Sequence, residues 1–282
     1  MKRMAFWLVG GTFLAIIVTL VTFSTNKFDT KELRGNLLMV NPYGKNNGTN
    51  KGIETYDFMS GKSIEILNDL SIRDPLYSHD REKILFITGN CISEYNIKKQ
   101  VVNKLICGSE SAYYCAKYVP NKNEISYIIG NGFYIYNPDL NSSKLLTELA
   151  GDYTWDNKGE NILFNENGNV CRYNLANGTV DVLFDGQDPE YSNDNKFIAY
   201  RRLYNELIVR EIDTGREWTY EANGIKYYKF SPDDKFLAIF ENNASLRNMF
   251  GFELKVWDYT NGHKILLRKN IGSSSNSNFD WK

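Results

Sequence analysis

The chain of 282 residues contains few of the residues that hydrolytic and zinc-dependent sites require. It has two histidines, His79 and His263, and we expect both in solvated turns. No Gly-x-Ser-x-Gly elbow is present, so no serine nucleophile is indicated. The cysteine spacings fit no zinc site, and no twelve-residue calcium loop occurs. From motifs alone we therefore predict no catalytic residue and no metal ligand.

The composition also lacks a strong charge of either sign. The formal net charge is -1, which gives no support for a nucleic-acid partner. No proline-rich linker or charge block divides the chain, and no long helical periodicity follows residue 30. Aromatic residues make up 14%, and glycine and asparagine are scattered throughout. This composition is typical of many short strands joined by tight turns.

One long apolar run lies near the N-terminus, at residues 5–23. As a helix it would cover about 28 Å, close to the thickness of a hydrocarbon core. Lys2 and Arg3 precede it, so the positive-inside bias predicts a cytoplasmic N-terminus and an extracytoplasmic remainder, periplasmic in a diderm bacterium. The alternative is a secretory signal cleaved near Ser24, which has a poor cleavage site. Both interpretations predict that the bulk of the chain is exported.

Four cysteines in an exported chain permit disulfides. Cys91 and Cys107 flank a predicted hairpin whose turn lies near residues 98–99, so they are one candidate pair. Cys107 and Cys115 are the competing pair, and Cys171 is expected to be a buried thiol. In the remaining alternative all four are small core residues.

A ten-residue phrase recurs along the chain, and each copy starts at an aromatic anchor that ends a strand. Strong copies occupy residues 77–86, 191–200 and 230–239, and weaker copies start at residues 118 and 155. A sixth anchor, Trp281, lies at the C-terminal end of the sequence. The anchors are spaced by about 40 residues, the period of a four-stranded propeller blade.

Glycine-containing hairpin turns repeat with the same period, at Gly61, Gly178, Gly215 and Gly262. Residues 36–68 supply three strands, and residues 276–282 supply the missing one. We therefore predict an all-β, six-bladed propeller over residues 36–282, closed by the C-terminal strand. We predict that residues 1–27 form a cytoplasmic N-terminus and transmembrane helix and that residues 28–35 form a linker.

The best copy reads Phe-Ser-Pro-Asp-Asp-Lys-Phe-Leu-Ala at residues 230–238, and it resembles the WD40-like repeat of TolB-like six-bladed propellers. The resemblance covers residues 36–68 and 77–282. The copies at Tyr118 and Trp155 lack the Ser-Pro-Asp core. The resemblance implies a propeller fold and a tendency to bind, and it implies no reaction.

The residues three positions before the anchors form one candidate site. In a closed ring they lie around one mouth of the central channel: Asp74, Cys115, Asp152, Asp188, Tyr227 and Asn278. The carboxylates of Asp74, Asp152 and Asp188 are candidate ligands for a polar molecule or a divalent cation, although no cofactor is predicted outright. The alternative is that Asp74-Pro75 and Asp188-Pro189 only start turns.

Two long loops, residues 41–52 and 241–251, form the second candidate surface, because ring closure places both on one face. The second loop carries residue types that are enriched at interfaces: Leu246, Arg247, Met249 and Phe250. The alternative is a pair of tolerated insertions.

We expect a membrane-anchored, non-catalytic scaffold or sensor that binds proteins of the envelope or membrane. The alternative is an enzyme in the channel mouth, such as a metal-assisted lyase, cyclase or lactonase.

Overall fold

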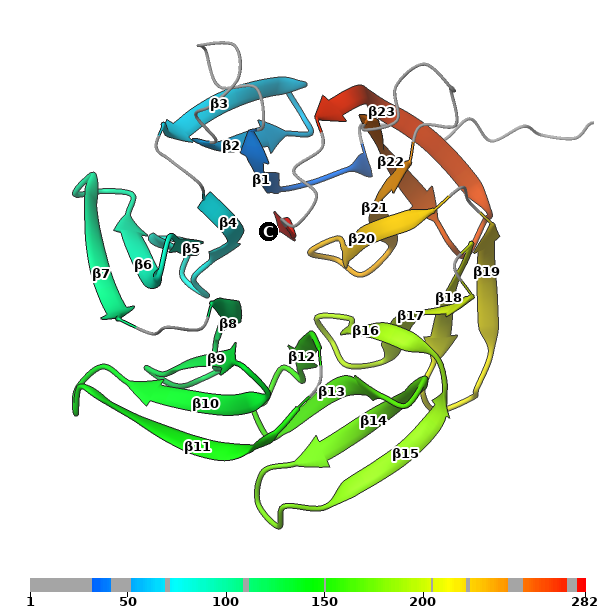
Figure 1. Ribbon diagram of the computed structural model, residues 1–282. Helices are drawn as coiled ribbons and strands as arrows, with labels where there is room; N and C mark the ends of the chain where they lie inside the picture. Colours follow the sequence, from blue (N-terminus) through cyan, green and yellow to red (C-terminus); the bar gives the residue numbers. More distant parts are fainter. Residues whose placement is uncertain are drawn as a thin grey trace, which may run out of the picture.

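The computed structural model describes residues 32–41, 52–68, 72–108, 112–149, 151–203, 205–221, 224–242, 251–272 and 278–282. They form six four-stranded antiparallel sheets. Figure 1 shows these sheets as blades arranged in a ring around a central axis. The chain is therefore a six-bladed β-propeller, as the repeat predicts.

The blades are numbered along the chain, and each is given from its innermost to its outermost strand. Blade 1 consists of β24 (Asp280–Trp281), β1 (Asn36–Asn41), β2 (Gly52–Asp57) and β3 (Lys62–Leu67). Blade 2 consists of β4 (Ile72–Tyr77), β5 (Lys83–Thr88), β6 (Cys91–Asn96) and β7 (Val101–Cys107). Blade 3 consists of β8 (Tyr113–Tyr118), β9 (Ile125–Ile129), β10 (Gly132–Asn137) and β11 (Ser142–Glu148).

Blade 4 consists of β12 (Tyr153–Trp155), β13 (Asn161–Glu166), β14 (Asn169–Asn174) and β15 (Val180–Asp185). Blade 5 consists of β16 (Gln187–Tyr191), β17 (Phe197–Leu203), β18 (Glu206–Glu211) and β19 (Glu217–Glu221). Blade 6 consists of β20 (Ile225–Phe230), β21 (Phe236–Asn242), β22 (Gly251–Asp258) and β23 (His263–Gly272).

The C-terminal strand closes the ring, as predicted. β24 pairs with β1, with Trp281 opposite Leu37. The Trp281 indole donates a hydrogen bond to the Arg34 carbonyl oxygen at 2.8 Å, and its ring centroid lies 4.6 Å from that of Phe58. The Asp280 carboxylate accepts a hydrogen bond from the Tyr77 amide of blade 2 at 3.0 Å. Ring closure thus completes blade 1 and links it to blade 2.

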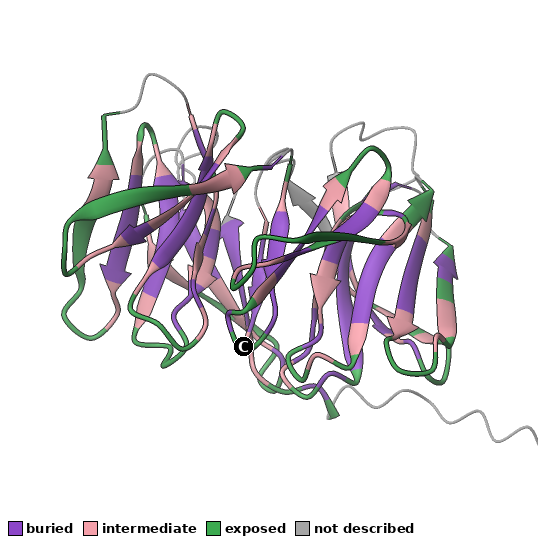
Figure 2. Ribbon diagram, turned by 90° about the horizontal axis from the view of Figure 1, so that it is seen from below, coloured by how far each residue is buried: buried purple, intermediate pink, exposed green. Residues whose placement is uncertain are grey.

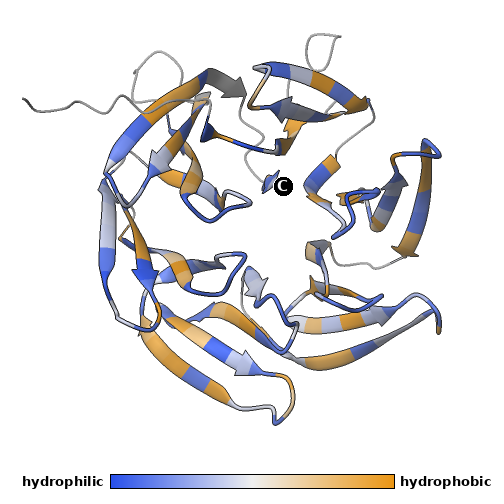
Figure 3. Ribbon diagram, turned by 180° about the vertical axis from the view of Figure 1, so that it is seen from behind, coloured by the Kyte–Doolittle hydropathy of each residue, from blue (hydrophilic) through white to orange (hydrophobic). Residues whose placement is uncertain are grey.

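The core lies between the blades. The second strand of each blade carries an apolar run that is covered on both faces, as in β5, β13 and β21. Figure 2 shows these strands as buried and the outer strands as largely exposed. Figure 3 shows orange and blue bands along the outer strands, where hydrophobic and hydrophilic residues are interspersed. Leu33, in the segment predicted as a linker, is fully buried in the cluster that joins blades 1 and 6.

The turns after the innermost strands have one geometry in blades 2 to 6. In each, the amide after the anchor donates to a carbonyl five residues later, as from Ser231 to Phe236 at 2.9 Å. The weaker copies make the same bond, from Val119 to Glu124 at 2.9 Å and from Asp156 to Asn161 at 3.0 Å. This backbone bond explains why the turn persists where the Ser-Pro-Asp core is missing.

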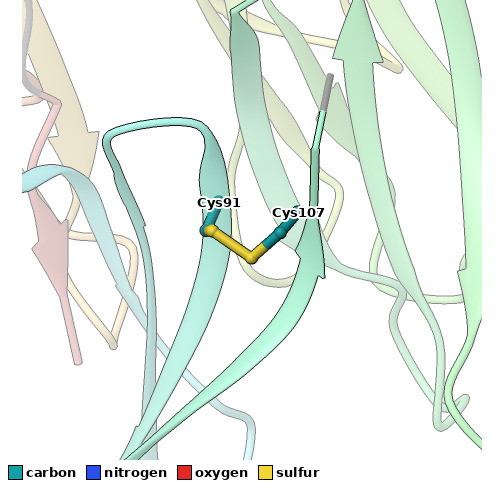
Figure 4. The surroundings of a disulfide bond; sticks show 2 residues. All are labelled: Cys91 and Cys107. Atoms are coloured by element: carbon teal, nitrogen blue, oxygen red, sulfur yellow. A yellow bond between two sulfur atoms is a disulfide. The ribbon is translucent and has the colours of Figure 1, made fainter.

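A disulfide joins Cys91 to Cys107, the predicted hairpin pair, across β6 and β7 (Figure 4). Cys171 is a buried free cysteine, as predicted, and Cys115 is also free. The predicted transmembrane segment lies outside the described residues. Among the residues that the structure does describe, none forms a helix long and apolar enough to cross a membrane.

Candidate functional site

A pocket of about 670 Å³ opens at the end of the channel where the innermost strands begin. Residues one and three positions before an anchor line it together, as Lys117 and Cys115 do in blade 3. All six residues that the sequence places at this mouth line the pocket: Asp74, Cys115, Asp152, Asp188, Tyr227 and Asn278. The structure therefore brings the predicted carboxylates together at one mouth, which we call the channel mouth.

Three of these residues sit in an unusual backbone conformation. Asp74, Cys115 and Asp188 have φ angles of 51°, 53° and 51°. Each lies where the pairing register of its innermost strand shifts, which marks a β-bulge. The Asp-Pro pairs therefore lie within β4 and β16 as bulges and do not precede these strands as turns. Left-handed non-glycine residues are uncommon and gather at functional sites.

Groups of the neighbouring blades hold these bulges in place. The Tyr153 hydroxyl donates to the Cys115 carbonyl oxygen at 2.8 Å. The Tyr228 hydroxyl donates to the Asp188 carbonyl oxygen in the same manner. Asp74 instead accepts a hydrogen bond from the Asn278 amide at 3.0 Å. Because each bulge is held by a group of an adjacent blade, the mouth is preorganised by ring closure.

Two of the three aspartates are neutralised by bases. Asp152 lies 2.9 Å from the Lys117 ammonium group, and Asp188 is paired with Arg201. Burial disfavours the charge of Asp152, but Lys117 outweighs it and holds the pKa of Asp152 below its usual value. Burial also disfavours the charge of Lys117, but the negative charges of Asp152 and Glu190 outweigh burial and raise the pKa of Lys117. Both members of this pair are therefore charged at neutral pH.

The third aspartate has a different environment. Burial raises the pKa of Asp74 from 3.8 to about 6, the Asn278 amide opposes this rise, and the negative charge of Asp152 adds to it. Burial and the charge of Asp152 also raise the pKa of Cys115 well above its usual value. Cys115 is consequently a neutral thiol at neutral pH, which is not the state of an activated nucleophile.

The described acidic side chains of the mouth are not clustered as metal ligands are. In the part of the chain that the structure describes, no three His, Cys, Asp or Glu side chains are grouped closely enough to hold a metal ion. Two of the carboxylates already face bases. The mouth presents charges of both signs to a polar ligand. Tyr114 and Tyr227 add aromatic surface.

A second, smaller pocket of about 240 Å³ lies further along the channel, towards the turns. Four residues line both pockets and form a neck between them: Leu76, Lys117, Glu190 and Lys229. Lys229 and Glu190 are paired across blades 5 and 6. The neck therefore separates the pocket at the mouth from the pocket at the turn end of the channel.

Sequence reasoning missed the basic half of the mouth. Lys117 and Lys229 each stand one position before an anchor, so strand alternation was sufficient to find them. Arg201 lies on β17 and carries no comparable signal. The other predicted surface, Leu246, Arg247, Met249 and Phe250, lies outside the described residues.

The sequence matches no known family and no curated protein. Solved structures do match. A TolB-like protein from Agrobacterium tumefaciens superposes with a TM-score of 0.65 at 12% identity, over 88% of this chain and 94% of that chain. An oligogalacturonate lyase in complex with manganese superposes with a TM-score of 0.52 at 12% identity, over 84% and 74%. At such identities the likeness supports the six-bladed propeller fold alone.

Proposed function

We propose that this protein is a membrane-anchored, extracytoplasmic propeller that works by binding a protein partner at the channel mouth. The observation that carries the proposal is the pocket of about 670 Å³ at that mouth. Its walls combine fixed bulges, ion pairs and tyrosines, a mixture suited to a polar segment of a partner protein. We propose that this partner is a protein of the envelope or membrane.

Two features of the chain support the proposed location. Residues 5–23 are long and apolar enough for a transmembrane helix. The Cys91–Cys107 disulfide belongs to an oxidising compartment, such as the periplasm of a diderm bacterium. The alternative remains a secreted propeller released by cleavage near Ser24. The mature N-terminus of the membrane-bound protein distinguishes the two.

Affinity capture of the full chain from membranes tests the proposed binding. Replacing the mouth pair by Asp188→Asn and Arg201→Gln removes both charges and leaves a polar amide at each position. The matched control is Asp181→Asn with Arg172→Gln, an ion pair of 2.7 Å on the outer surface of blade 4. We expect the mouth variant to lose the co-purifying partner and the control to retain it. Equal recovery from both variants contradicts the proposal.

The second candidate is an enzyme at the same mouth. Asp74 and Asp152 favour it, because the pKa of one is raised and that of the other is lowered. Such a split is typical of a general acid paired with a base. One structural neighbour is a lyase with manganese, so a metal-assisted lyase, cyclase or lactonase is the form to test.

Thermal unfolding with added manganese or calcium separates the two candidates. Since two of the carboxylates face bases, we expect neither ion to raise the unfolding temperature. A rise that disappears when Asp74, Asp152 and Asp188 are all changed to asparagine would favour the enzyme.

A further inference from the structure

The chain enters the propeller on the face opposite the channel mouth. We call this face the turn face, because it carries the turns after the first and third strands of each blade. Asn36 starts β1 there, and its amide donates to the Lys282 carbonyl oxygen at 2.6 Å. A Cβ atom on the preceding Gly35 would lie 2.2 Å from that oxygen and 3.2 Å from Pro232 of the blade 6 turn. In Figure 2 the turn face is the lower edge of the molecule, and the C-terminus lies there among the exposed turns.

The segment before this entry point is short. Residues 24–31 separate the apolar run from Glu32, the first described residue. Fully extended, they span at most about 28 Å. Given the membrane anchor of the proposed function, on which this inference rests, the turn face lies towards the lipid surface. The channel mouth then faces away from it.

The turn face of blades 1 to 4 carries side chains suited to a lipid surface. Met59 and Leu140 are each 73% exposed at the tips of turns in blades 1 and 3. Exposed lysines lie in the turns of blades 2, 3 and 4: Lys98, Lys99, Lys122 and Lys158.

Charge pairing distinguishes these lysines from those in the turns of blades 5 and 6. None of the four has an ion pair among the described residues, whereas Lys196 and Lys235 of blades 5 and 6 are paired with neighbouring aspartates. Single exposed apolar residues are common on proteins. Here Met59 and Leu140 lie on the same face as the four lysines without a described ion pair, and residues 24–31 lead from the predicted membrane helix to that face.

We propose that a turn patch, formed by Met59, Lys98, Lys99, Lys122, Leu140 and Lys158, rests on the membrane surface. Met59 and Leu140 enter the headgroup region, and the lysines contact anionic headgroups while their alkyl stems lie along the interface. The contact fixes the orientation of the ring. It presents the channel mouth to partners on the side away from the lipid.

Hydrogen exchange of the full chain tests this orientation. The chain is compared in detergent micelles, in phosphatidylcholine vesicles, and in vesicles that also contain phosphatidylglycerol. We expect the turn amides around Met59, Lys99 and Leu140 to exchange about tenfold more slowly in the anionic vesicles, which corresponds to about 1.4 kcal/mol of local protection. Turns on the opposite face, at residues 89–90, 130–131 and 167–168, should exchange equally in all three.

Paired variants test the named side chains. Met59→Asp with Leu140→Asp should abolish the slow exchange. Leu203→Asp, at a residue that is 63% exposed on the mouth face, should leave it unchanged. Equal exchange of the patch in anionic vesicles and micelles overturns the proposal, as does protection of the mouth face. Equal protection with and without phosphatidylglycerol overturns the role of the lysines.

Flotation of the same vesicles after a carbonate wash checks the anchor separately. If the chain does not float, the anchored form in the proposed function is wrong, and the turn patch fails with it. If the chain floats and the patch exchanges freely, only the turn patch is wrong.

Discussion

Replacing Asp74 by asparagine should stabilise the protein at neutral pH. Asparagine has the size of aspartate, tolerates the left-handed backbone found at this position, and keeps an oxygen for the Asn278 amide. What it removes is a carboxylate whose ionised form is disfavoured by burial and by the nearby charge of Asp152. Asp74 therefore lowers the free energy of unfolding, as expected of a group retained for binding.

The size of the effect follows from the pKa. Folding raises the pKa of Asp74 from 3.8 to about 6. A carboxyl group with a raised pKa contributes most to stability below its unfolded pKa, and this contribution is lost as the pH rises through the folded value. By this linkage the free energy of unfolding of the wild type is lower than that of Asp74→Asn by up to about 3 kcal/mol near pH 8. Near pH 5 the difference is about half of that.

Urea unfolding of the full chain in micelles, followed by tryptophan fluorescence, measures this difference. Asp74→Asn should have the higher midpoint near pH 8, and the two curves should converge as the pH falls towards 4. A variant that is no more stable than the wild type near pH 8 would mean that ionised Asp74 does not destabilise the fold. A stability gain that does not change with pH would mean that the ionisation of Asp74 is not its cause.

Three further predictions concern stability in the same assay. Trp281→Ala should cost about 3–5 kcal/mol, because Trp281 is fully buried where the ring closes; a loss below about 1 kcal/mol would mean that the closing strand contributes little. Replacing Cys91 and Cys107 by alanine should cost about 3 kcal/mol, the value expected for a closed loop of this length, and reduction of the wild type should reproduce the loss. Tyr228→Phe should cost about 1–3 kcal/mol, because it leaves the Asp188 carbonyl oxygen without this donor, and an unchanged midpoint would argue against a role in holding the bulge.

The ring itself was predictable because its signal is periodic. Aromatic anchors and glycine turns recur at the same spacing, and the strand missing from residues 36–68 matches the strand left over at the C-terminus. The weak copies at Tyr118 and Trp155 lack the Ser-Pro-Asp core, yet they form the same turn. There the backbone hydrogen bond that the turns of blades 2 to 6 share keeps the geometry without that core, and no residue type predicts this bond.

The mouth was predictable in position and less so in chemistry. Counting three residues back from each anchor gave the aspartates, and strand alternation gives Lys117. Arg201 comes from β17, and its pairing with Asp188 depends on how two strands bend at a bulge. The positive φ angles also had no local signal at Cys115, since cysteine is not a residue that favours them.

Site-specific photo-cross-linking in the intact membrane tests whether a partner protein binds at the channel mouth. A photoreactive amino acid replaces Tyr114, which lines the mouth and is 48% exposed. The control position is Leu145 on the outer strand of blade 3, which is 50% exposed. We predict a covalent adduct with a membrane or envelope protein from position 114 and none from position 145. A captured partner that cross-links from position 145 and not from position 114 would contradict the account.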